Sequence, residues 1–176
     1  RHGRLLAHVV ARRGADAIWV QAQMLAAGHA RFYGLPGQFH CAAELQAQER
    51  VAQARQLGLW RSAAYQTRQA ARTGELMRLR STYQIVAGRV AKVGRTRGRL
   101  YLNFGADWRT DFTIGISNAL TSANPAWASD LDRLAGAIVH VRGWIDRRNG
   151  PYIELSDPSE LEVVVAPASQ GRTEGH

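Results

Sequence analysis

Residues 1–60 combine one region of short apolar runs with two stretches of helical period. The apolar runs Leu5–Val10 and Ala17–Val20 flank a turn cluster at residues 12–16, and this pattern predicts a β-hairpin. After the hairpin the apolar positions change to helical spacing, which predicts a short helix that ends near Gly28.

A second and longer helix is expected from about Cys41 to Leu57, with Gly58 as its stop signal. We expect Cys41 to be a small buried residue on this helix rather than a nucleophile, because no His/Asn framework accompanies it. Glu49 is interpreted as an anchored carboxylate on the helix, and Trp60 as a cover over the core.

The second half of the chain reads as a series of strands. Residues 61–81 are polar and are interpreted as a partly helical linker. The pattern that follows predicts short strands at Gln84–Val93, Arg99–Gly105, Phe112–Ser117, Ala137–Asp146, Tyr152–Ser156 and Leu161–Val165. One helix is expected at Ala126–Leu134, and Asn149-Gly150 is a strong hairpin signal.

These elements predict a fold that is mainly β with α. Five or six short strands with one helix after the third are typical of a small closed β-barrel of the oligonucleotide-binding (OB) type, here over residues 82–165. Residues 166–176 are interpreted as a disordered tail.

The basic residues are unevenly distributed between the two halves. The chain has 23 Lys and Arg against 14 Asp and Glu, a net charge of +9. Residues 1–80 hold 12 arginines and four acidic residues, a balance of +8, whereas residues 81–176 hold 11 basic and 10 acidic residues, a balance of +1. A positive field attracts phosphate without sequence preference, so nucleic acid is the partner that the charge favours.

Lys92 is the only lysine. Arginine suits bidentate phosphate contacts, but such a bias also follows from GC-rich coding, and both explanations stay open.

Two classes of protein are excluded by composition. The single cysteine cannot form an intramolecular disulfide and provides no paired-cysteine zinc motif. No run of 18 apolar residues occurs, so the pattern predicts no membrane-spanning segment.

Motifs in the first half carry a family resemblance. They are, in order, Gly3-Arg4-Leu5-Leu6-Ala7, Gly28-His29-Ala30-Arg31, Leu45 with Glu49, and Gly58-Leu59-Trp60. On these motifs, residues 1–60 resemble the C-terminal part of the nuclease domain of the staphylococcal-nuclease-like (thermonuclease) family. The resemblance implies a partial nuclease barrel, consisting of a hairpin plus two or three helices.

The second half looks like the OB-like domain that is appended in some bacterial members of that family. The matching residues are Gly88, Tyr101-Leu102-Asn103-Phe104-Gly105, Asp111-Phe112-Thr113, Arg142-Gly143-Trp144 and Gly150-Pro151-Tyr152-Ile153-Glu154.

The resemblance implies calcium-dependent hydrolysis of DNA or RNA phosphodiesters. In such sites two aspartates hold the metal, a glutamate activates water and two arginines neutralise charge on the phosphorus. The match places one of these arginines at Arg4, whereas the other arginine and the carboxylates belong to strands that this sequence lacks. We therefore identify no metal ligands in this chain and expect it to be inactive alone.

The chain starts without methionine directly ahead of the first strand, which predicts that it begins within a domain. We expect an upstream segment, a partner chain or the second domain to complete the first barrel. The resemblance favours a periplasmic or secreted location.

Two groups of residues are candidates for binding nucleic acid. Arg31 and Tyr33 follow the first helix, near the place where the family has nucleotide-contacting groups, although packing is an alternative for Tyr33. The second group combines basic residues with aromatic ones, as single-strand binding surfaces do: Arg89, Lys92, Arg95, Arg97, Arg99, Tyr101 and Phe104. The alternative is a charged hairpin that keeps the strands soluble.

Other polar residues are given structural roles. We interpret Asp107 and Asp111 as turn residues rather than metal ligands, and His140 as an ordinary strand residue.

Three hypotheses follow. The chain contributes Arg4 to a thermonuclease-like phosphodiesterase, or it is a nucleic-acid-binding module without catalysis, or it is a structural accessory subunit on a degenerate nuclease fold.

Overall fold

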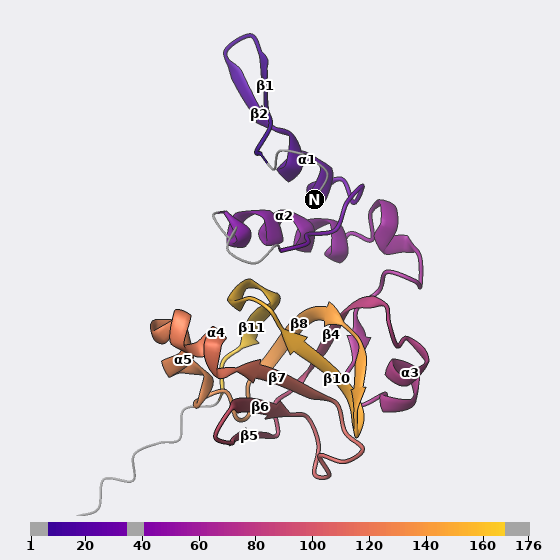
Figure 1. The fold of residues 1–176 in the computed structure, drawn as a ribbon. Coiled ribbons are helices and arrows are strands. Elements are labelled where there is room, and N and C mark those ends of the chain that lie inside the picture. The colour runs from indigo at the N-terminus through magenta and orange to yellow at the C-terminus, as the bar shows by residue number, and fades with distance from the viewer. Residues whose placement is uncertain (1–6, 35–40, 168–176) are drawn as a thin grey trace, which may run out of the picture. The chain divides into compact units, whose positions relative to one another are not determined.

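The computed structural model describes residues 7–34 and 41–167. The chain divides into two compact units, Arg1–Gln66 and Thr67–His176, and each is considered by itself (Figure 1).

The first unit is a hairpin followed by helices. Its elements are β1 (Val10–Arg13), β2 (Asp16–Trp19), α1 (Val20–Ala26), α2 (Ala42–Ala54) and the 3₁₀ helix η1 (Gly58–Arg61). The two strands are antiparallel, with Val10 opposite Trp19 and Arg13 opposite Asp16. Helices α1 and α2 pack together, and Leu25, Phe32 and Leu45 form a small core between them. A hairpin and both predicted helices are therefore present. The first strand covers Val10–Arg13 instead of the predicted Leu5–Val10, of which residues 5 and 6 lie outside the described residues.

Two glycines allow the end of α1 to meet the segment after α2. Gly28 and Gly58 both have positive φ, and the backbone N–H of Leu59 donates to the carbonyl of Gly28 at 2.9 Å. A Cβ at Gly28 would lie 2.3 Å from the Leu57 carbonyl oxygen, so only glycine permits this approach.

The structural roles expected for Glu49 and Trp60 agree with their burial, whereas the expectation for Cys41 is wrong. Both Glu49 and Trp60 are buried. Cys41 is exposed and precedes α2 in a left-handed conformation with φ 68°. The reason is that α2 begins one residue later, so Cys41 lies outside the packing face of the helix.

Residues 61–81 contain more structure than the predicted linker. The short strand β3 (Arg68–Gln69) pairs in parallel with β4 (Tyr83–Arg89), and α3 (Thr73–Arg78) follows it. Ala70 and Leu76 are buried in the core of the second unit. Within this segment only Ala70 and Leu76 are buried, so its sequence shows no hydrophobic periodicity from which these elements could be predicted.

The second unit contains two sheets that enclose one core (Figure 1). One sheet has the order β5-β6-β7-β10-β9 and the other the order β11-β8-β4-β3. The remaining elements are β5 (Lys92–Arg95), β6 (Arg99–Asn103), β7 (Thr113–Ser117), α4 (Asn118–Ala123), α5 (Pro125–Leu131), β8 (Ile138–Trp144), β9 (Asp146–Arg148), β10 (Gly150–Leu155), η2 (Pro158–Glu160) and β11 (Leu161–Val165).

The fold class is mainly β with α, as predicted, but the described strands form two sheets instead of one closed hydrogen-bonded barrel. Two of the crossings between the sheets are sharp bends. At the first, Val90 bonds to Gly136 and Ala137 while Ala91 bonds to Asn103. At the second, the buried Ile145 separates β8 from β9. The predicted strands at 84–93 and 137–146 are each divided by such a bend.

Candidate nucleic-acid interface

One face of the five-stranded sheet is apolar and the other is polar. Leu102, Ile114 and Ile153 lie opposite one another and are buried in the core. Because side chains alternate along a strand, the residues between them point to the other side. We call this side the polar face. Across it, one row of paired residues contains Lys92, Asn103, Thr113 and Tyr152, and the next contains Gly94, Tyr101, Gly115 and Glu154.

The polar face is hollowed into a pocket of about 560 Å³. Lys92, Tyr101 and Tyr152 line its floor from the strands, while Trp108 and Arg148 line it from the β6–β7 loop and β9. The lining therefore combines aromatic rings with basic groups.

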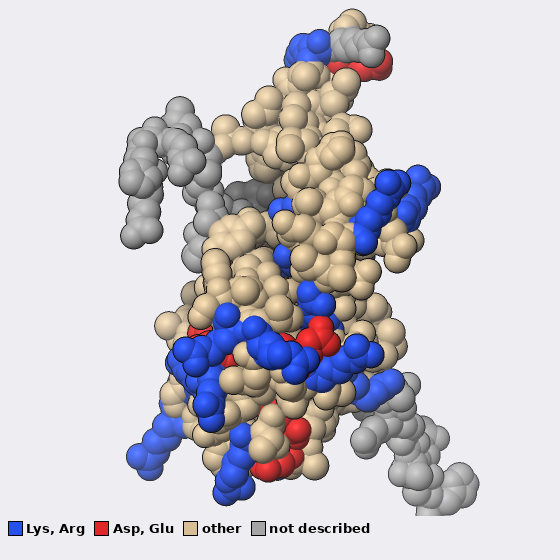
Figure 2. All heavy atoms as spheres, turned by 90° about the vertical axis from the view of Figure 1, so that its right-hand side faces the viewer, with Lys and Arg blue, Asp and Glu red and all other residues tan. Residues whose placement is uncertain are grey.

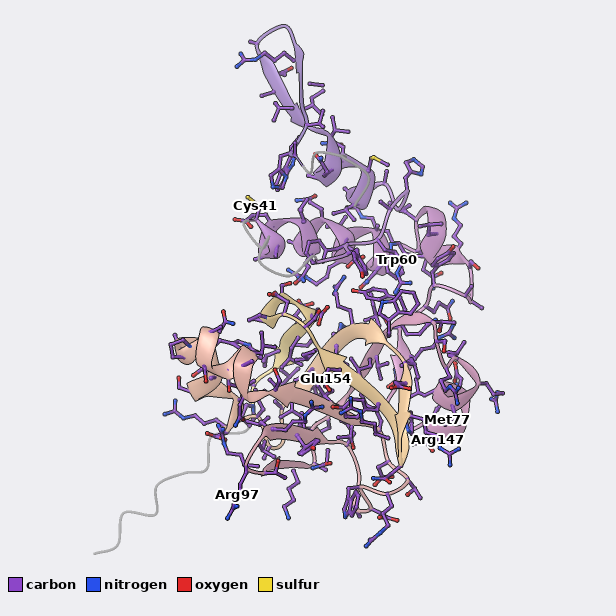
Figure 3. The ribbon with its side chains drawn as sticks, in the orientation of Figure 1. Cys41, Trp60, Met77, Arg97, Arg147 and Glu154 are labelled. Carbon is purple, nitrogen blue, oxygen red and sulfur yellow. The ribbon has the colours of Figure 1, made fainter. Side chains whose placement is uncertain are left out.

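A charged network lies on this face around Glu154 (Figure 3). The Glu154 carboxylate accepts from the Arg99 guanidinium, and the Tyr152 hydroxyl donates to it at 2.5 Å. Arg148 approaches the same carboxylate at 3.4 Å, and its guanidinium lies 4.5 Å from the centre of the Tyr152 ring. Arg99 also donates to the Tyr152 hydroxyl at 2.9 Å. The network brings together residues of β6, β9 and β10.

Tyr152 is held as a neutral phenol. Its side chain is only 1% exposed. Burial raises the pKa of the Tyr152 hydroxyl, and its hydrogen bond to Glu154 raises the pKa further. The hydroxyl is therefore a permanent donor that fixes the position of Glu154.

Arg95 faces the same pocket but is engaged by an acid. Its Nε and Nη2 donate to the two carboxylate oxygens of Asp132 at 2.8 and 2.7 Å. The hydrogen bonds from Arg95 lower the pKa of Asp132 below its usual value. Asp132 thus offsets one of the positive charges beside the pocket.

Besides Tyr152, Trp108 is an aromatic residue of this site that the sequence pattern does not indicate. It is 52% exposed, and the Arg109 guanidinium lies 4.7 Å from the centre of its ring. Two hydrogen bonds shape the loop. The Asp107 carboxylate accepts from the Arg109 N–H at 3.0 Å, and the backbone N–H of Asp107 donates to the Asp111 carboxylate at 2.7 Å. These contacts agree with the interpretation of both aspartates as turn residues.

The structure separates Phe104 from the polar face. Phe104 packs against the core, with its ring centre 5.0 Å from that of Phe112. The sequence prediction placed it beside Tyr101, but an odd sequence separation puts two strand residues on opposite faces. Phe104 is therefore removed from the candidate interface.

Two of the predicted basic residues also lie apart from the pocket. Arg89 is on β4 of the other sheet, where it donates to the Gly136 carbonyl at 2.6 Å. Arg97 is exposed in the β5–β6 turn, and Figure 3 shows it directed away from the sheet. Lys92, Arg95, Arg99 and Tyr101 are the predicted residues that the structure brings together.

The candidates in the first unit have different surroundings. The Arg31 guanidinium lies 5.6 Å from the centre of the Trp60 ring and 5.7 Å from that of Tyr65. Tyr33 is exposed. Arg4 lies outside the described residues.

The described residues do not fit the calcium site that the resemblance implies. Within residues 7–34 and 41–167, no three His, Cys, Asp or Glu side chains are grouped so that they could hold a metal ion. In the same ranges no helix is both long and apolar enough to cross a membrane.

Comparisons with solved structures gave matches to part of this chain at low identity. The structure titled "OBody AM1L10 bound to hen egg-white lysozyme" is 21% identical with a TM-score of 0.39, and the match covers 53% of this chain and 90% of that one. An aspartyl tRNA synthetase from Entamoeba histolytica is 11% identical with a TM-score of 0.44, covering 60% of this chain and 23% of the synthetase. An asparaginyl-tRNA synthetase from Pyrococcus horikoshii, complexed with asparaginyl-adenylate, is 19% identical with a TM-score of 0.37, covering 51% and 20%. The match thus spans less than a quarter of either synthetase.

The N-terminal third of the chain matches a family model. No curated protein matched the chain. The model described as "Staphylococcal nuclease homologue" matches residues 1–62. Residues 1–62 are therefore similar to the staphylococcal nuclease homologues, which confirms the resemblance found in the motifs of residues 1–60.

Proposed function

We propose that the second unit binds single-stranded nucleic acid on its polar face. The observation that carries this proposal is the pocket of about 560 Å³, in which Tyr101 and Trp108 lie beside Lys92 and Arg148. Aromatic rings stack with bases, at about 1–3 kcal/mol per base, while basic groups neutralise the phosphates. The occupant is a single strand, because bases paired in a duplex do not present their faces to such rings.

The charges of the polar face favour stacking as the larger contribution to affinity. Arg95 is paired with Asp132, and both Arg99 and Arg148 contact Glu154. The carboxylates paired with these arginines repel phosphate, so the arginines contribute less than three unpaired ones would. Trp108, which is half-exposed at the rim, is the residue on which we expect binding to depend most.

Binding of a fluorescent oligonucleotide of about five nucleotides tests the proposal. We expect Trp108→Ala and Tyr101→Ala each to weaken binding by about tenfold, which corresponds to the loss of one stacked base. Trp144→Ala is the matched control, because Trp144 is an exposed tryptophan on β8, in the other sheet. Equal affinities of Trp108→Ala and the unmodified chain would contradict the proposal. Comparing DNA with RNA in the same assay establishes which is preferred.

We also propose that the bound strand is a substrate of phosphodiester hydrolysis in the parent protein. The similarity of residues 1–62 to staphylococcal nuclease homologues supports this step. In it, Arg4 neutralises charge that develops on the phosphorus. The carboxylates for a calcium ion come from a segment or partner chain other than the described residues, which hold no suitable group.

Cleavage of a single-stranded oligonucleotide, with calcium or with chelator, tests this second step. We expect the 176-residue chain alone to cleave neither DNA nor RNA. Calcium-dependent cleavage that Arg4→Ala abolishes would show that the chain holds a complete site.

The alternative function is a non-catalytic one. An accessory subunit that binds nucleic acid without cleaving it would show the stacking dependence above and no hydrolysis. A purely structural subunit would show neither, and any residual binding would lack the steep salt dependence of phosphate neutralisation.

A further inference from the structure

We propose that a nucleic-acid strand longer than the polar face continues around β9 onto a second surface, formed by Arg78, Arg80 and Arg147. We call these three residues the arginine surface. The inference rests on the proposed function, because it extends the same bound strand. It assigns the second unit a longer binding path than its pocket provides.

The backbone brings Arg80 and Arg147 onto neighbouring segments. The Ser81 N–H donates to the carbonyl of Ile145 at 2.8 Å, and the Ile145 N–H donates to the carbonyl of Thr82 at 2.9 Å. These bonds lie just beyond the end of the ladder in which Tyr83 is opposite Trp144, where Ser81 has a positive φ and the chain turns. Arg80 directly precedes Ser81, and Arg147 follows Ile145 by two residues, so these bonds hold the two arginines on adjoining segments. Both residues are exposed.

Helix α3 adds Arg78 to this surface. The buried Leu76 fixes α3 against the core, and α3 packs on β10. Arg78 lies in the last turn of α3 and is exposed. Figure 2, which views the side of the molecule on which α3 lies, shows a band of basic side chains across the second unit.

The neighbouring acids are already engaged. Glu75 pairs with Arg68 at 3.0 Å and approaches Arg72 at 3.7 Å. The Asp146 carboxylate accepts from the backbone N–H of Arg147 at 2.7 Å. Within residues 7–34 and 41–167, the three side chains of the arginine surface take part in no ion pair. Exposed like charges on adjoining segments favour a polyanion as their partner.

Strand β9 makes the arginine surface continuous with the polar face. Arg148 lines the pocket on one side of β9. Arg147 precedes it and therefore points to the other side, since successive side chains of a strand alternate. β9 is the edge strand of its sheet, so a phosphodiester backbone that leaves Arg148 meets no further strand before Arg147.

The dependence of affinity on oligonucleotide length tests this path. Binding to the 176-residue chain is measured for oligonucleotides of about 5 and about 15 nucleotides, which bracket the site sizes of such domains. The test variant is Arg80→Gln with Arg147→Gln. Arg147→Gln alone is compared with Arg133→Gln, which removes the same charge from an exposed residue just after α5, on the side of the unit away from α3. Circular dichroism verifies that each variant is folded.

The expected result is a loss that depends on length. The double variant binds the short oligonucleotide like the unmodified chain but binds the long one about five- to tenfold more weakly. For the long oligonucleotide, the slope of log affinity against log salt concentration is also smaller in magnitude by about 1.4, which is about 0.7 for each lost phosphate contact. Arg133→Gln changes neither affinity.

Other outcomes overturn the inference. Equal losses at both lengths would place the two arginines at the pocket itself, and no loss at either length would remove them from the path. If Arg80 and Arg147 are instead needed for binding vesicles of phosphatidylserine and not for the long oligonucleotide, the surface serves lipid headgroups. All three outcomes differ from failure of the proposed function, in which the short oligonucleotide does not depend on Trp108.

Discussion

The side chain of Tyr152 crosses the backbone of Gly115 so closely that a Cβ atom at Gly115 would lie 1.6 Å from the Tyr152 hydroxyl oxygen. Tyr152 is paired with Thr113 in the register of β10 and β7, and Glu154 is paired with Gly115. The phenol therefore leans along β10 to reach Glu154, over the one position of β7 that has no side chain. Gly115 provides the space on which the Glu154 network depends.

Gly115→Ala is expected to destabilise the second unit by about 1–3 kcal/mol, the usual cost of overpacking a close contact. Tyr152 cannot move away cheaply, because it is buried and its hydroxyl is bonded to Arg99 and Glu154. Thermal unfolding measures the loss. Gly94→Ala is the control on the same face, since its Cβ would meet nothing nearer than the Asn103 Nδ2 at 3.8 Å. A similar change in both variants would show that the contact with Tyr152 is not the cause.

Glu49→Ala is expected to destabilise the first unit by about 1–3 kcal/mol. Glu49 is fully buried, and its Oε1 accepts from the Phe32 N–H at 2.8 Å. Removal of the carboxylate leaves this buried donor unsatisfied. The free energies of unfolding of the variant and of the unmodified chain are measured by chemical denaturation, with fluorescence as the signal.

Glu44→Ala serves as the comparison for Glu49→Ala. Glu44 is exposed on the same helix, so its loss should change the free energy of unfolding by no more than about 0.5 kcal/mol. If Glu49→Ala is no more destabilising than Glu44→Ala, its buried hydrogen bond contributes nothing.

The sequence predicts strand β6 well because core residues and polar residues alternate along it. Leu100 and Leu102 point inward while Tyr101 and Asn103 line the pocket, as the period of two requires. The Glu154 network could not be predicted this way. It joins Arg99 to a residue 55 positions later, through the parallel pairing of β7 with β10.

Trp108 escaped prediction for a different reason. It lies in a loop, where hydrophobic period carries no information, and its neighbours Asp107 and Arg109 resemble ordinary turn residues. An aromatic residue in a loop between two strands of a binding face is the signal that would have identified it. The sequence does not indicate the arginine surface, because the polar composition of residues 61–81 predicts a linker. In the structure Leu76 anchors α3 of this segment in the core.

Asp132→Asn is expected to strengthen oligonucleotide binding about two- to fivefold. The substitution removes one negative charge near the pocket and releases the Arg95 guanidinium, which Asp132 now holds by two hydrogen bonds. A released arginine can contact phosphate. Fluorescence anisotropy at two salt concentrations measures the change, which should shrink at the higher one. Asp130→Asn removes the same charge from an exposed site on α5 and should have the smaller effect. An equal gain in both variants would mean that net charge alone is responsible.

The Arg95–Asp132 pair also predicts a pH dependence of stability. The hydrogen bonds from Arg95 lower the pKa of Asp132 from its usual 3.8, so the pair favours the folded state when Asp132 is ionised. Its contribution is fully present above pH 3.8 and is lost as the pH falls through the lower, folded-state pKa. Because both side chains are about half-exposed, this contribution should not exceed about 1 kcal/mol. The free energy of unfolding of Asp132→Asn should therefore lie below that of the unmodified chain at pH 6, and the two should converge below pH 3.8. A difference that stays constant over this range would show that Asp132 stabilises the fold by something other than its charge.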